Sequence, residues 1–224
     1  GGFGTRLYPL TKSVSKQLLP INDKPMIFYP LSILMLSGIK DILIITSPRD
    51  KPSFMSLLGN GENLGISIEY IEQNEPKGIA DAFLLGSNFI KDDSVTLILG
   101  DNLFFGYDLV STFKNAIKDL KKATIFAYPV NNPSDYGVVE LDKNNEVINI
   151  EEKPENPSSR YAVTGIYMYD NSILDIAKSI KPSERGELEI TDVNKVYLDK
   201  NHLDAVIFGR GVAWLDTGSH QSLL

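Results

Sequence analysis

The apolar positions of this chain follow two patterns that alternate along the sequence. In one, apolar residues form short runs that are continuous or alternate with polar residues. In the other, they recur at helical spacing. The short runs predict strands at residues 41–46, 66–71, 95–99 and 123–130. Before and between them, the helical spacing predicts helices at residues 24–36, 51–58, 78–89 and 109–120. Strands and helices that alternate in this way indicate βαβ units around a largely parallel sheet.

One predicted helix has its ends marked by proline and glycine. Pro25 lies near the first turn of helix 24–36, and Gly38 follows its last residue. Pro30, inside the same segment, should kink the helix or mark its true start. The segment is apolar, so we expect it to be buried.

The pattern changes from residue 136 onward. Two alternating runs at residues 136–141 and 147–151 flank a turn at 142–145, which predicts a hairpin. The remaining predicted elements are a loop at 152–159, a strand at 162–169, helices at 172–180 and 188–200, and short strands at 203–208 and 212–215. The prediction is therefore one α/β domain over residues 1–224, with a mixed, mostly parallel central sheet flanked by helices and with a β-hairpin insertion.

The first residues predict a phosphate-binding turn. They include Gly1, Gly2, Gly4 and Thr5. Glycines let backbone N–H groups approach phosphate oxygens, and Arg6 and Lys16 add positive charge nearby. The GxxxxGK[ST] pattern of a Walker loop is absent, and Leu7 stands where a dinucleotide fingerprint has its third glycine. The alternative is an ordinary glycine-rich loop.

Two aspartates each follow a predicted strand. Asp101 comes after strand 95–99, and Asp216 comes after strand 212–215. Ligands of open α/β sheets bind at the carboxyl ends of strands, and Mg²⁺ takes one or two carboxylates with waters and phosphate oxygens. Asp101 and Asp216 are therefore a candidate magnesium pair, inferred across a long sequence separation. The alternatives are a turn aspartate at Asp101 and a helix N-cap at Asp216.

The composition limits the classes of function. The chain has 224 residues, a formal net charge of −7 and no cysteine. An acidic chain lacks the basic surface that non-specific nucleic-acid binding needs. Without cysteine there is no disulfide, no thiolate metal site and no cysteine nucleophile, which fits a cytoplasmic protein. No apolar run approaches the roughly 20 residues of a membrane span. A few placed cations and a metal would therefore have to hold any phosphate.

Nine segments carry a resemblance to a known family. In chain order they are GGFGTRLYPL, SKQLLP, DKPMI, LGDN, YGVVE, EEKP, AVTGIYMYDN, RGELEITDVN and WLDTGSHQSLL. In this order they resemble the sugar-nucleotide pyrophosphorylases, which are sugar nucleotidylyltransferases, over nearly the whole chain. VSKQLLPI and RGELEIT are typical of the thymidylyl branch of that family. The resemblance implies a Rossmann-like fold of the nucleotide-diphospho-sugar transferase type, with the hairpin on the sugar side.

The resemblance also implies roles for single residues. The implied catalytic residues are Arg6, Lys16 and Asp101. The implied nucleotide-binding residues are Gly1, Gly2, Gly4, Thr5, Arg6, Gln73, Gly78 and Asp101. The implied sugar-phosphate-binding residues are Tyr136, Gly137, Glu152, Lys153, Val163, Thr164 and Gly165. The implied Mg²⁺ ligands are Asp101 and Asp216. Gln73 has the amide donor and acceptor that suit the edge of a thymine or uracil ring.

By the same resemblance, an oxygen of a sugar 1-phosphate attacks the α-phosphorus of dTTP in line, and pyrophosphate leaves. Glucose 1-phosphate is then the second substrate, and dTDP-glucose is the other product. Catalysis would consist of positioning and charge neutralisation. The expected protein partner is a second copy of the chain, as a homodimer or homotetramer in the cytoplasm, with no nucleic acid and no membrane.

Three alternatives stay open. One is a transferase that uses UTP or ATP with a related sugar 1-phosphate. Another is a non-catalytic homologue that only binds sugar nucleotides, which the presence of Arg6, Lys16, Asp101 and Asp216 disfavours. The third, a glycosyltransferase, is disfavoured because the sequence has no DxD motif.

The family resemblance also bears on the ends of the chain. Family chains have a short strand before the glycine loop and a helical tail after the WLDTG region, and this sequence contains neither. We therefore expect the chain expressed alone to aggregate and to have little transferase activity, because neighbouring strands would lack backbone partners.

Overall fold

The computed structural model describes residues 7–217. They fall into two compact units, and each unit is made of segments that are separate in the sequence. The first unit contains the chain up to Pro76, Leu99–Lys114, and the chain from Trp214 onward. The second contains Lys77–Ile98 and Asn115–Ala213. None of the helices in residues 7–217 is long and apolar enough to cross a membrane.

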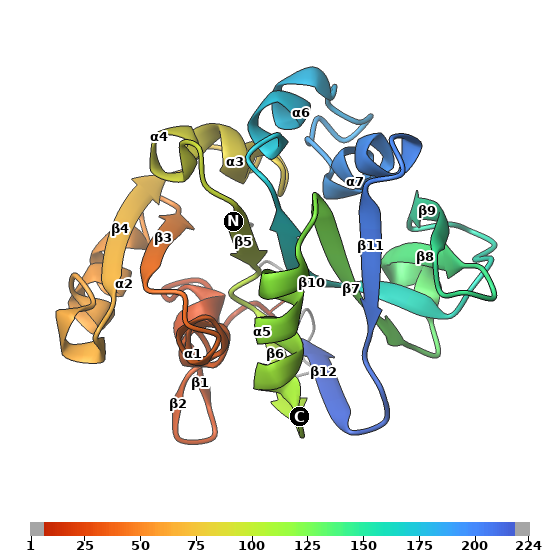
Figure 1. Cartoon of the computed structure of the whole chain (residues 1–224). Helices are drawn as coiled ribbons and strands as arrows, with labels where there is room; N and C mark the ends of the chain where they lie inside the picture. Colours follow the sequence, from red (N-terminus) through yellow and green to blue (C-terminus); the bar gives the residue numbers. More distant parts are fainter. Residues whose placement is uncertain (1–6, 218–224) are drawn as a thin grey trace. The chain divides into compact units, whose positions relative to one another are not determined.

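The first unit is built from short sheets and helices (Figure 1). Its strands are β1 (Pro20–Ile21), β2 (Lys24–Pro25), β3 (Asp41–Thr46), β4 (Ser67–Glu72), β6 (Asn102–Gly106) and most of β12 (Val212–Asp216). Its helices are η2 (Lys16–Leu18), α1 (Phe28–Leu36), α2 (Lys51–Leu58) and η3 (Glu62–Leu64). β3 and β4 pair in parallel with α2 between them in the chain, which is the predicted βαβ order. β1 pairs antiparallel with β2, and β6 pairs with β12.

Helix α1 begins later than the sequence predicts. The pair β1–β2 takes the first residues of the predicted segment 24–36, and the helix starts only at Phe28. Pro30 therefore lies in the first turn, where its missing N–H removes no intrahelical hydrogen bond. At the other end, Gly38 adopts a φ of 95° just after the helix, as its position in the sequence predicts.

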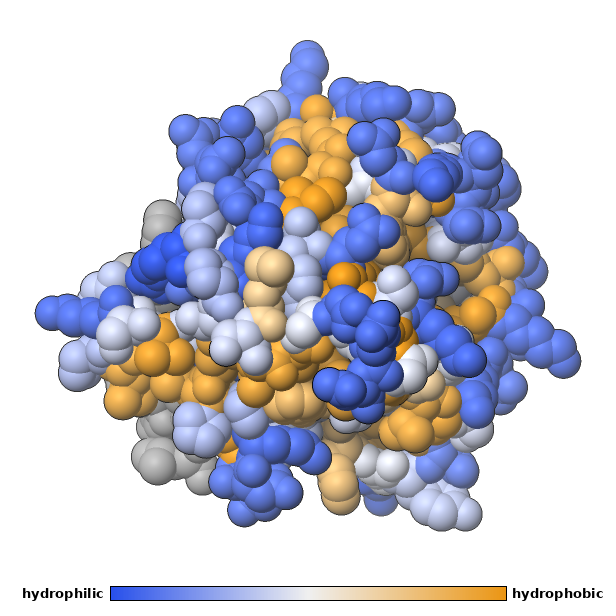
Figure 2. Space-filling view, turned by 90° about the vertical axis from the view of Figure 1, so that its left-hand side faces the viewer, coloured by the Kyte–Doolittle hydropathy of each residue, from blue (hydrophilic) through white to orange (hydrophobic). Residues whose placement is uncertain are grey.

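Several large apolar side chains of the first unit are exposed. Phe105 and Tyr107, around the end of β6, have exposed fractions of 82% and 83%, and Leu36 is also exposed. Figure 2 shows one face of the molecule, on which hydrophobic residues gather in patches among hydrophilic ones. Exposed apolar side chains are common on folded proteins, and Phe105, Tyr107 and Leu36 do not by themselves indicate a binding surface.

The second unit is built on a six-stranded sheet in the order β11-β7-β10-β8-β9, with β5 also paired to β10. Its strands are β5 (Val95–Ile98), β7 (Ala123–Pro129), β8 (Gly137–Leu141), β9 (Val147–Glu152), β10 (Tyr161–Tyr169) and β11 (Leu203–Ile207). Its helices are α3 (Asp81–Leu85), α4 (Ser87–Ile90), η4 (Pro133–Asp135), α6 (Ile173–Ser179) and α7 (Ile190–Asp199). Helix α5 (Leu109–Asp119) runs in the chain from the first unit into the second.

Strand β10 is the central strand of this sheet. It pairs antiparallel with β7 along one edge, while its other edge is shared between β8, at Tyr161 and Ala162, and β5, at Ile166–Tyr169. The predicted hairpin is confirmed as the antiparallel pair β8–β9. The sheet is mixed, as predicted, but it contains more antiparallel pairing than expected. β7 and β11 run parallel, whereas β10 runs opposite to each of its neighbours.

The predicted helix 78–89 is two short helices. Gly78 has a φ of 97°, which is outside the helical region, so α3 begins only at Asp81. Gly86 then separates α3 from α4. Glycine is a weak helix former in the interior of a helix, and the hydrophobic pattern alone does not register its effect.

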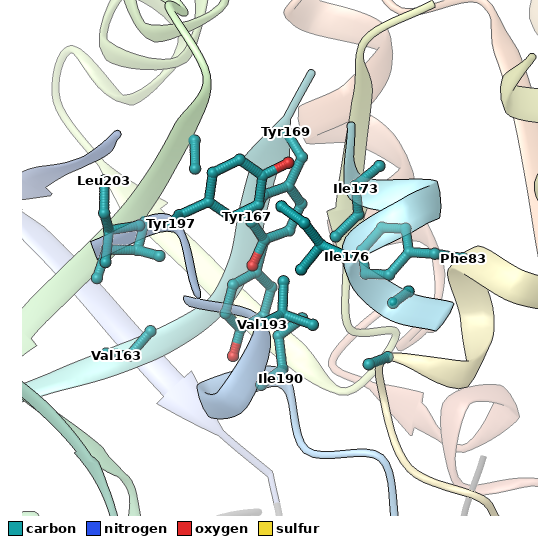
Figure 3. Close-up of a cluster of buried hydrophobic side chains, with 14 of the residues drawn as sticks. Phe83, Val163, Tyr167, Tyr169, Ile173, Ile176, Ile190, Val193, Tyr197 and Leu203 are labelled. Carbon is teal, nitrogen blue, oxygen red and sulfur yellow. The ribbon is translucent and has the colours of Figure 1, made fainter. Parts of the chain in front are cut away.

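The core of the second unit surrounds the fully buried ring of Tyr169 (Figure 3). The ring meets Phe83 edge-on with centroids 5.4 Å apart, and it stacks on Tyr197 at 5.3 Å. Its hydroxyl donates a hydrogen bond to Asn194 Oδ1 at 2.6 Å. Aromatic pairs in these geometries add stability beyond the area that they bury. Tyr169 thereby connects β10 to α3 and α7.

A polar network begins at the next residue. The Asp170 carboxylate accepts hydrogen bonds from Lys122 Nζ at 2.7 Å, from the Tyr197 hydroxyl at 3.1 Å and from Ser172 Oγ. Burial alone would raise the pKa of Asp170, but the hydrogen bonds from Lys122, Ser172 and Tyr197 outweigh it and hold the pKa below its ordinary value. The charged form of Asp170 is therefore favoured by folding.

This network predicts an acid-dependent contribution to stability. A carboxyl group with a lowered pKa stabilises the fold above its unfolded pKa of about 4, and this contribution is lost as the pH falls through the folded value. We expect Asp170→Asn to lower the free energy of unfolding at neutral pH by about 1–3 kcal/mol. The difference from wild type should shrink below about pH 4, as measured by urea titrations at several pH values.

Asp175→Asn is the matched control. The Asp175 side chain is 89% exposed and pairs with Lys178 at 3.4 Å, so its loss should change stability by less than about 0.5 kcal/mol. A constant difference between Asp170→Asn and wild type at every pH would contradict the assignment.

Candidate functional site

Lys16 and Asp101 form an ion pair in the first unit. Lys16 begins η2, and Asp101 lies directly before β6. Lys16 Nζ is 2.7 Å from Asp101 Oδ2, and the two side chains are 10% and 27% exposed. Gly100 allows this approach, since a Cβ there would lie 3.1 Å from Gln17 Cγ. The structure thus brings together two residues that the sequence analysis assigns to one site.

The Asp101 carboxylate is held on its other oxygen by a short chain of hydrogen bonds. Asn102 Nδ2 donates to Asp101 Oδ1 at 3.2 Å. Trp214 Nε1 in turn donates to Asn102 Oδ1 at 2.6 Å. Asn102 and Trp214 are both buried. A buried amide with both ends hydrogen-bonded has little freedom to turn, so the orientation of Asp101 is fixed by packed neighbours.

The end of β12, which is distant from Asp101 in the sequence, lies close to it in space. Buried Thr217 donates both its hydroxyl, at 2.8 Å, and its backbone N–H, at 3.3 Å, to the Asp101 carbonyl oxygen. Asp216, one residue earlier, ends β12, so its backbone lies near the backbone of Asp101. Within residues 7–217 no group of three or more His, Cys, Asp or Glu is placed to hold a metal. Two carboxylates still match the donor set of Mg²⁺ when waters and phosphate oxygens complete it.

Gln73 lies at the carboxyl end of the parallel pair β3–β4. Its backbone N–H donates to the Thr46 carbonyl at 2.8 Å and extends the strand pairing by one residue. Ligands of open α/β sheets bind at this edge, which is consistent with the nucleotide-binding role that the family resemblance implies for Gln73. Next to it, Lys51 Nζ and Glu72 Oε1 form an ion pair at 3.0 Å.

In the second unit, Gly78 lies against the backbone of Leu188. The Leu188 N–H donates to the Lys77 carbonyl at 2.8 Å, and the Ala80 N–H donates to the Leu188 carbonyl at 3.2 Å. A Cβ at Gly78 would lie 2.4 Å from the Leu188 carbonyl oxygen, so glycine is required for this contact. This contact, here called the Gly78–Leu188 clasp, joins residues 77–80 to Leu188.

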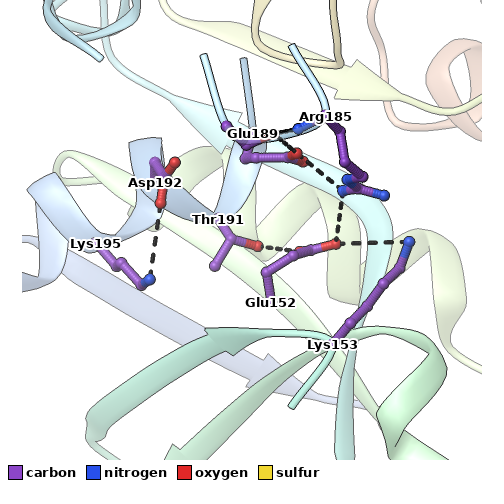
Figure 4. Close-up of polar contacts among 8 residues, drawn as sticks. Glu152, Lys153, Arg185, Glu189, Thr191, Asp192 and Lys195 are labelled. Carbon is purple, nitrogen blue, oxygen red and sulfur yellow. Dashed lines mark hydrogen bonds and ion pairs between the residues drawn. The ribbon is translucent and has the colours of Figure 1, made fainter. Parts of the chain in front are cut away.

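Glu152, at the end of β9, is the centre of the predicted sugar-side residues (Figure 4). Its Oε2 accepts a hydrogen bond from Thr191 Oγ1 at 2.6 Å. Its Oε1 lies 3.9 Å from Lys153 Nζ and 3.8 Å from Arg185 Nη2. One carboxylate therefore faces a neutral donor on one side and two cations on the other.

The backbone of Lys153 explains how it reaches Glu152. Successive side chains of a continuous strand point to opposite faces. Lys153 directly follows the last residue of β9 and has a φ of 46°, which interrupts the strand conformation. Its N–H donates to the Tyr136 carbonyl at 3.0 Å. This turn lets the ammonium approach the Glu152 carboxylate. The Lys153 side chain is partly exposed, so its charge is accessible to a ligand.

The other predicted sugar-side residues lie on the neighbouring strands. A Cβ at Gly137 would lie 3.3 Å from Thr191 Oγ1 and 3.4 Å from Glu152 Oε2, so glycine leaves room for these two groups. Val163, Thr164 and Gly165 coincide with the register shift of β10 against β7. Thr164 is fully buried, and its hydroxyl has no hydrogen-bond partner within residues 7–217. Bulges of this kind re-aim side chains and are frequent beside binding sites.

Arg185 and Thr191 also belong to this cluster, although no role for them was predicted from the sequence. Arg185 Nη2 donates to Glu189 Oε1 at 2.9 Å, and this hydrogen bond raises the pKa of Arg185. Ser183 Oγ donates to the same Glu189 oxygen at 2.7 Å. Arg185, Glu189 and Thr191 all belong to the RGELEIT segment. The match of the RGELEIT segment to the family was the signal from which a role for these three residues could have been predicted.

Some predicted site residues cannot be placed. Gly1, Gly2, Gly4, Thr5 and Arg6 lie outside the described residues. Their phosphate-binding roles therefore stay predictions.

Comparison with known proteins gives consistent matches. The nucleotidyl transferase family model matches residues 1–224. The glucose-1-phosphate thymidylyltransferase of Neisseria meningitidis serogroup A is 56% identical over 223 residues, which cover 100% of this chain and 77% of the relative. The enzyme of the same name from Mycolicibacterium smegmatis is 53% identical over 224 residues, with the same coverage.

Solved structures agree with these matches. A Bacillus anthracis protein solved in complex with sucrose is 40% identical, with a TM-score of 0.92, covering 100% of this chain and 89% of that chain. A UDP-glucose pyrophosphorylase complexed with UDP-glucose is 28% identical, with a TM-score of 0.87, covering 100% and 92%. These comparisons confirm the predicted fold class and the family resemblance.

The Gly78–Leu188 clasp leads to a prediction with a matched control. Gly78 and Gly186 both have left-handed backbones, with φ of 97° and 76°, but a Cβ at Gly186 would meet nothing within 4 Å. Gly186→Ala should therefore cost only the backbone strain, about 1–2 kcal/mol. Gly78→Ala adds a clash with main-chain atoms and should cost more than about 3 kcal/mol. Urea unfolding of both variants measures the difference in the free energy of unfolding. An equal decrease in the two variants would show that the backbone at Leu188 can move away from the added Cβ without loss of stability.

Proposed function

The chain belongs to the nucleotidyl transferase family, and we propose from this premise that it transfers a thymidylyl group from dTTP to glucose 1-phosphate. The products are dTDP-glucose and pyrophosphate. The observation that carries the proposal is the identity of 53–56%, along the whole chain, to relatives named glucose-1-phosphate thymidylyltransferase. The side chains of each unit support it independently.

The reaction is a phosphoryl-type displacement between anions. An oxygen of the sugar 1-phosphate attacks the α-phosphorus of dTTP. The bond between the α-phosphorus and the oxygen that bridges it to the β-phosphorus breaks, and pyrophosphate leaves with the electron pair. Such a step needs the two substrates held in line and their negative charge compensated, without a covalent enzyme intermediate. In a chain with a net charge of −7, this compensation falls to a few placed cations.

The first unit carries the proposed nucleotide side. Lys16 is proposed to contact the α-phosphate, because a flexible ammonium can follow a phosphate oxygen. Arg6 and the glycine turn are proposed to hold the β- and γ-phosphates, and Gln73 is proposed to read the base. Asp101 and Asp216 would hold Mg²⁺, which when bound supplies positive charge to the phosphate oxygens.

The second unit carries the proposed sugar side. Glu152 is proposed to accept hydrogen bonds from sugar hydroxyls, since Thr191 fixes one of its oxygens at 2.6 Å. Lys153 and Arg185, both within 4 Å of Glu152 Oε1, are proposed to hold the sugar phosphate. The segments proposed to line this site are Tyr136–Gly137 and Val163–Gly165, and Gly78 is proposed to complete the readout of the base through its backbone. Assembly into a homo-oligomer and a cytoplasmic location are proposals of the sequence analysis alone.

A pyrophosphate-release assay tests the function. The protein is supplied with dTTP, UTP, ATP or GTP, each with glucose 1-phosphate and Mg²⁺. We expect dTTP to give the highest kcat/KM, and a clear preference for UTP or ATP would instead support the rival nucleotidylyltransferase. Asp101→Asn should lose more than about 100-fold in kcat, because Asp101 carries charge at the reacting phosphates. The variant should also melt at a lower temperature, because the largely buried Lys16 loses its counter-ion, so kcat is measured well below the melting transition. A normal Mg²⁺-dependent rate in this variant would remove Asp101 from the mechanism.

Steady-state kinetics of Lys153→Ala test the sugar side. Removing a cation that contacts only the sugar phosphate should raise the KM for glucose 1-phosphate about 10- to 100-fold and leave the KM for dTTP nearly unchanged. Lys178→Ala, which alters an exposed ion pair on α6, is the control and should behave as wild type. A defect confined to the KM for dTTP would contradict the placement of Lys153.

A further inference from the structure

We propose that Lys16 is the counter-ion of Asp101 in the ligand-free protein. A divalent cation then binds Asp101 weakly by itself and tightly only together with the nucleoside triphosphate. The inference rests on the proposed metal site at Asp101 and Asp216. It assigns Lys16 a role before catalysis, in addition to the phosphate contact proposed above.

The geometry of the ion pair is the first argument. Lys16 Nζ lies 2.7 Å from Asp101 Oδ2, and the Lys16 side chain is only 10% exposed. Mg²⁺ would bind a carboxylate oxygen at about 2.0–2.1 Å. An ammonium 2.7 Å from Oδ2 and a divalent cation bound to the same oxygen repel each other. Binding of the cation at Oδ2 therefore weakens the ion pair and favours movement of Lys16.

The surroundings of Asp101 decide which group moves. Oδ1 is occupied by the amide of Asn102, which is buried and fixed by the 2.6 Å hydrogen bond from Trp214. The Asp101 carbonyl is fixed by two hydrogen bonds from Thr217. Lys16, in contrast, is attached through a flexible four-carbon stem. The movable partner of Asp101 is thus the lysine.

The energetic cost of moving Lys16 explains the coupling. A largely buried ammonium that loses its carboxylate is strongly destabilised unless another anion replaces it. A free divalent cation brings no such anion, whereas a nucleotide triphosphate brings phosphate oxygens that can take the ammonium. With both ligands present, Lys16 passes to the phosphate and the metal takes Asp101, so every charge keeps a partner. Metal and nucleotide then bind with positive coupling.

Metal binding without nucleotide tests the proposal directly. The probe is Mn²⁺, titrated into the full chain and followed by electron paramagnetic resonance of the free ion. Lys16→Met removes the competing charge and should tighten Mn²⁺ binding about tenfold or more relative to wild type. Lys16→Arg keeps the charge and should bind Mn²⁺ as weakly as wild type. The double variant Lys16→Met/Asp101→Asn should lose the gain, which locates the metal at Asp101. A Lys16→Met affinity equal to that of wild type would overturn the inference.

A second titration keeps the result interpretable if Lys16→Met is less stable than wild type. Mn²⁺ binding is measured again in the presence of a non-reactive dTTP analogue with a methylene group between the α- and β-phosphorus atoms. In wild type the analogue should raise the Mn²⁺ affinity, and in Lys16→Met it should raise it by a smaller factor. Equal factors would contradict the counter-ion role.

The same experiment separates this inference from the proposed metal site. If Asp101→Asn binds Mn²⁺ with the analogue as tightly as wild type does, the metal site itself is wrong. If Asp101→Asn loses binding while Lys16→Met matches wild type in both titrations, only the counter-ion role is wrong.

Discussion

The second unit depends on the need of one buried strand to find backbone partners along both of its edges. Eight of the nine residues of β10 are buried, so their N–H and C=O groups cannot rely on water. β7 satisfies one edge, and β8 and β5 divide the other. The pairing of β8 with Tyr161 and Ala162 holds the β8–β9 hairpin against one half of β10, and Glu152 ends this hairpin. The register shift in β10 falls between the two halves, at the segment that contains Thr164.

Elements with a clear local pattern could be predicted from the sequence. The strands β3, β5 and β7 are short apolar runs, and the hairpin β8–β9 is marked by a turn, so the local signal and the final structure agree. The pair β6–β12 was not predicted, because it joins segments around Asn102 and Trp214, which are 112 residues apart. The single helix predicted at 78–89 was wrong for a related reason. The conformation of Gly78 is set by its contact with Leu188, a distant partner that no local pattern contains.

The candidate site divides along the same line. Lys16, Asp101, Glu152 and Lys153 were identified because they belong to recognisable motifs, and the structure shows that Lys16 meets Asp101 and that Lys153 meets Glu152. Arg185, Thr191 and Asn102 also lie in motifs of the resemblance, RGELEIT and LGDN, but no role was assigned to them from the sequence. Each of them contacts a predicted carboxylate. Motifs therefore pointed to the candidate acids and bases, while the contacts that orient them came only from the tertiary structure.

At Lys153, the left-handed backbone conformation favours one kind of residue, and the proposed contact with a phosphate favours another. Residues with a Cβ are strained by about 1–2 kcal/mol at a positive φ, and glycine or asparagine would adopt the φ of 46° more readily. Neither of those residues carries a positive charge. Stability alone would therefore favour asparagine or glycine here, whereas the sugar-phosphate contact proposed for this position requires a cation. A variant stabilised by replacing its strained residues with glycine or asparagine would therefore lose one of the two cations beside Glu152.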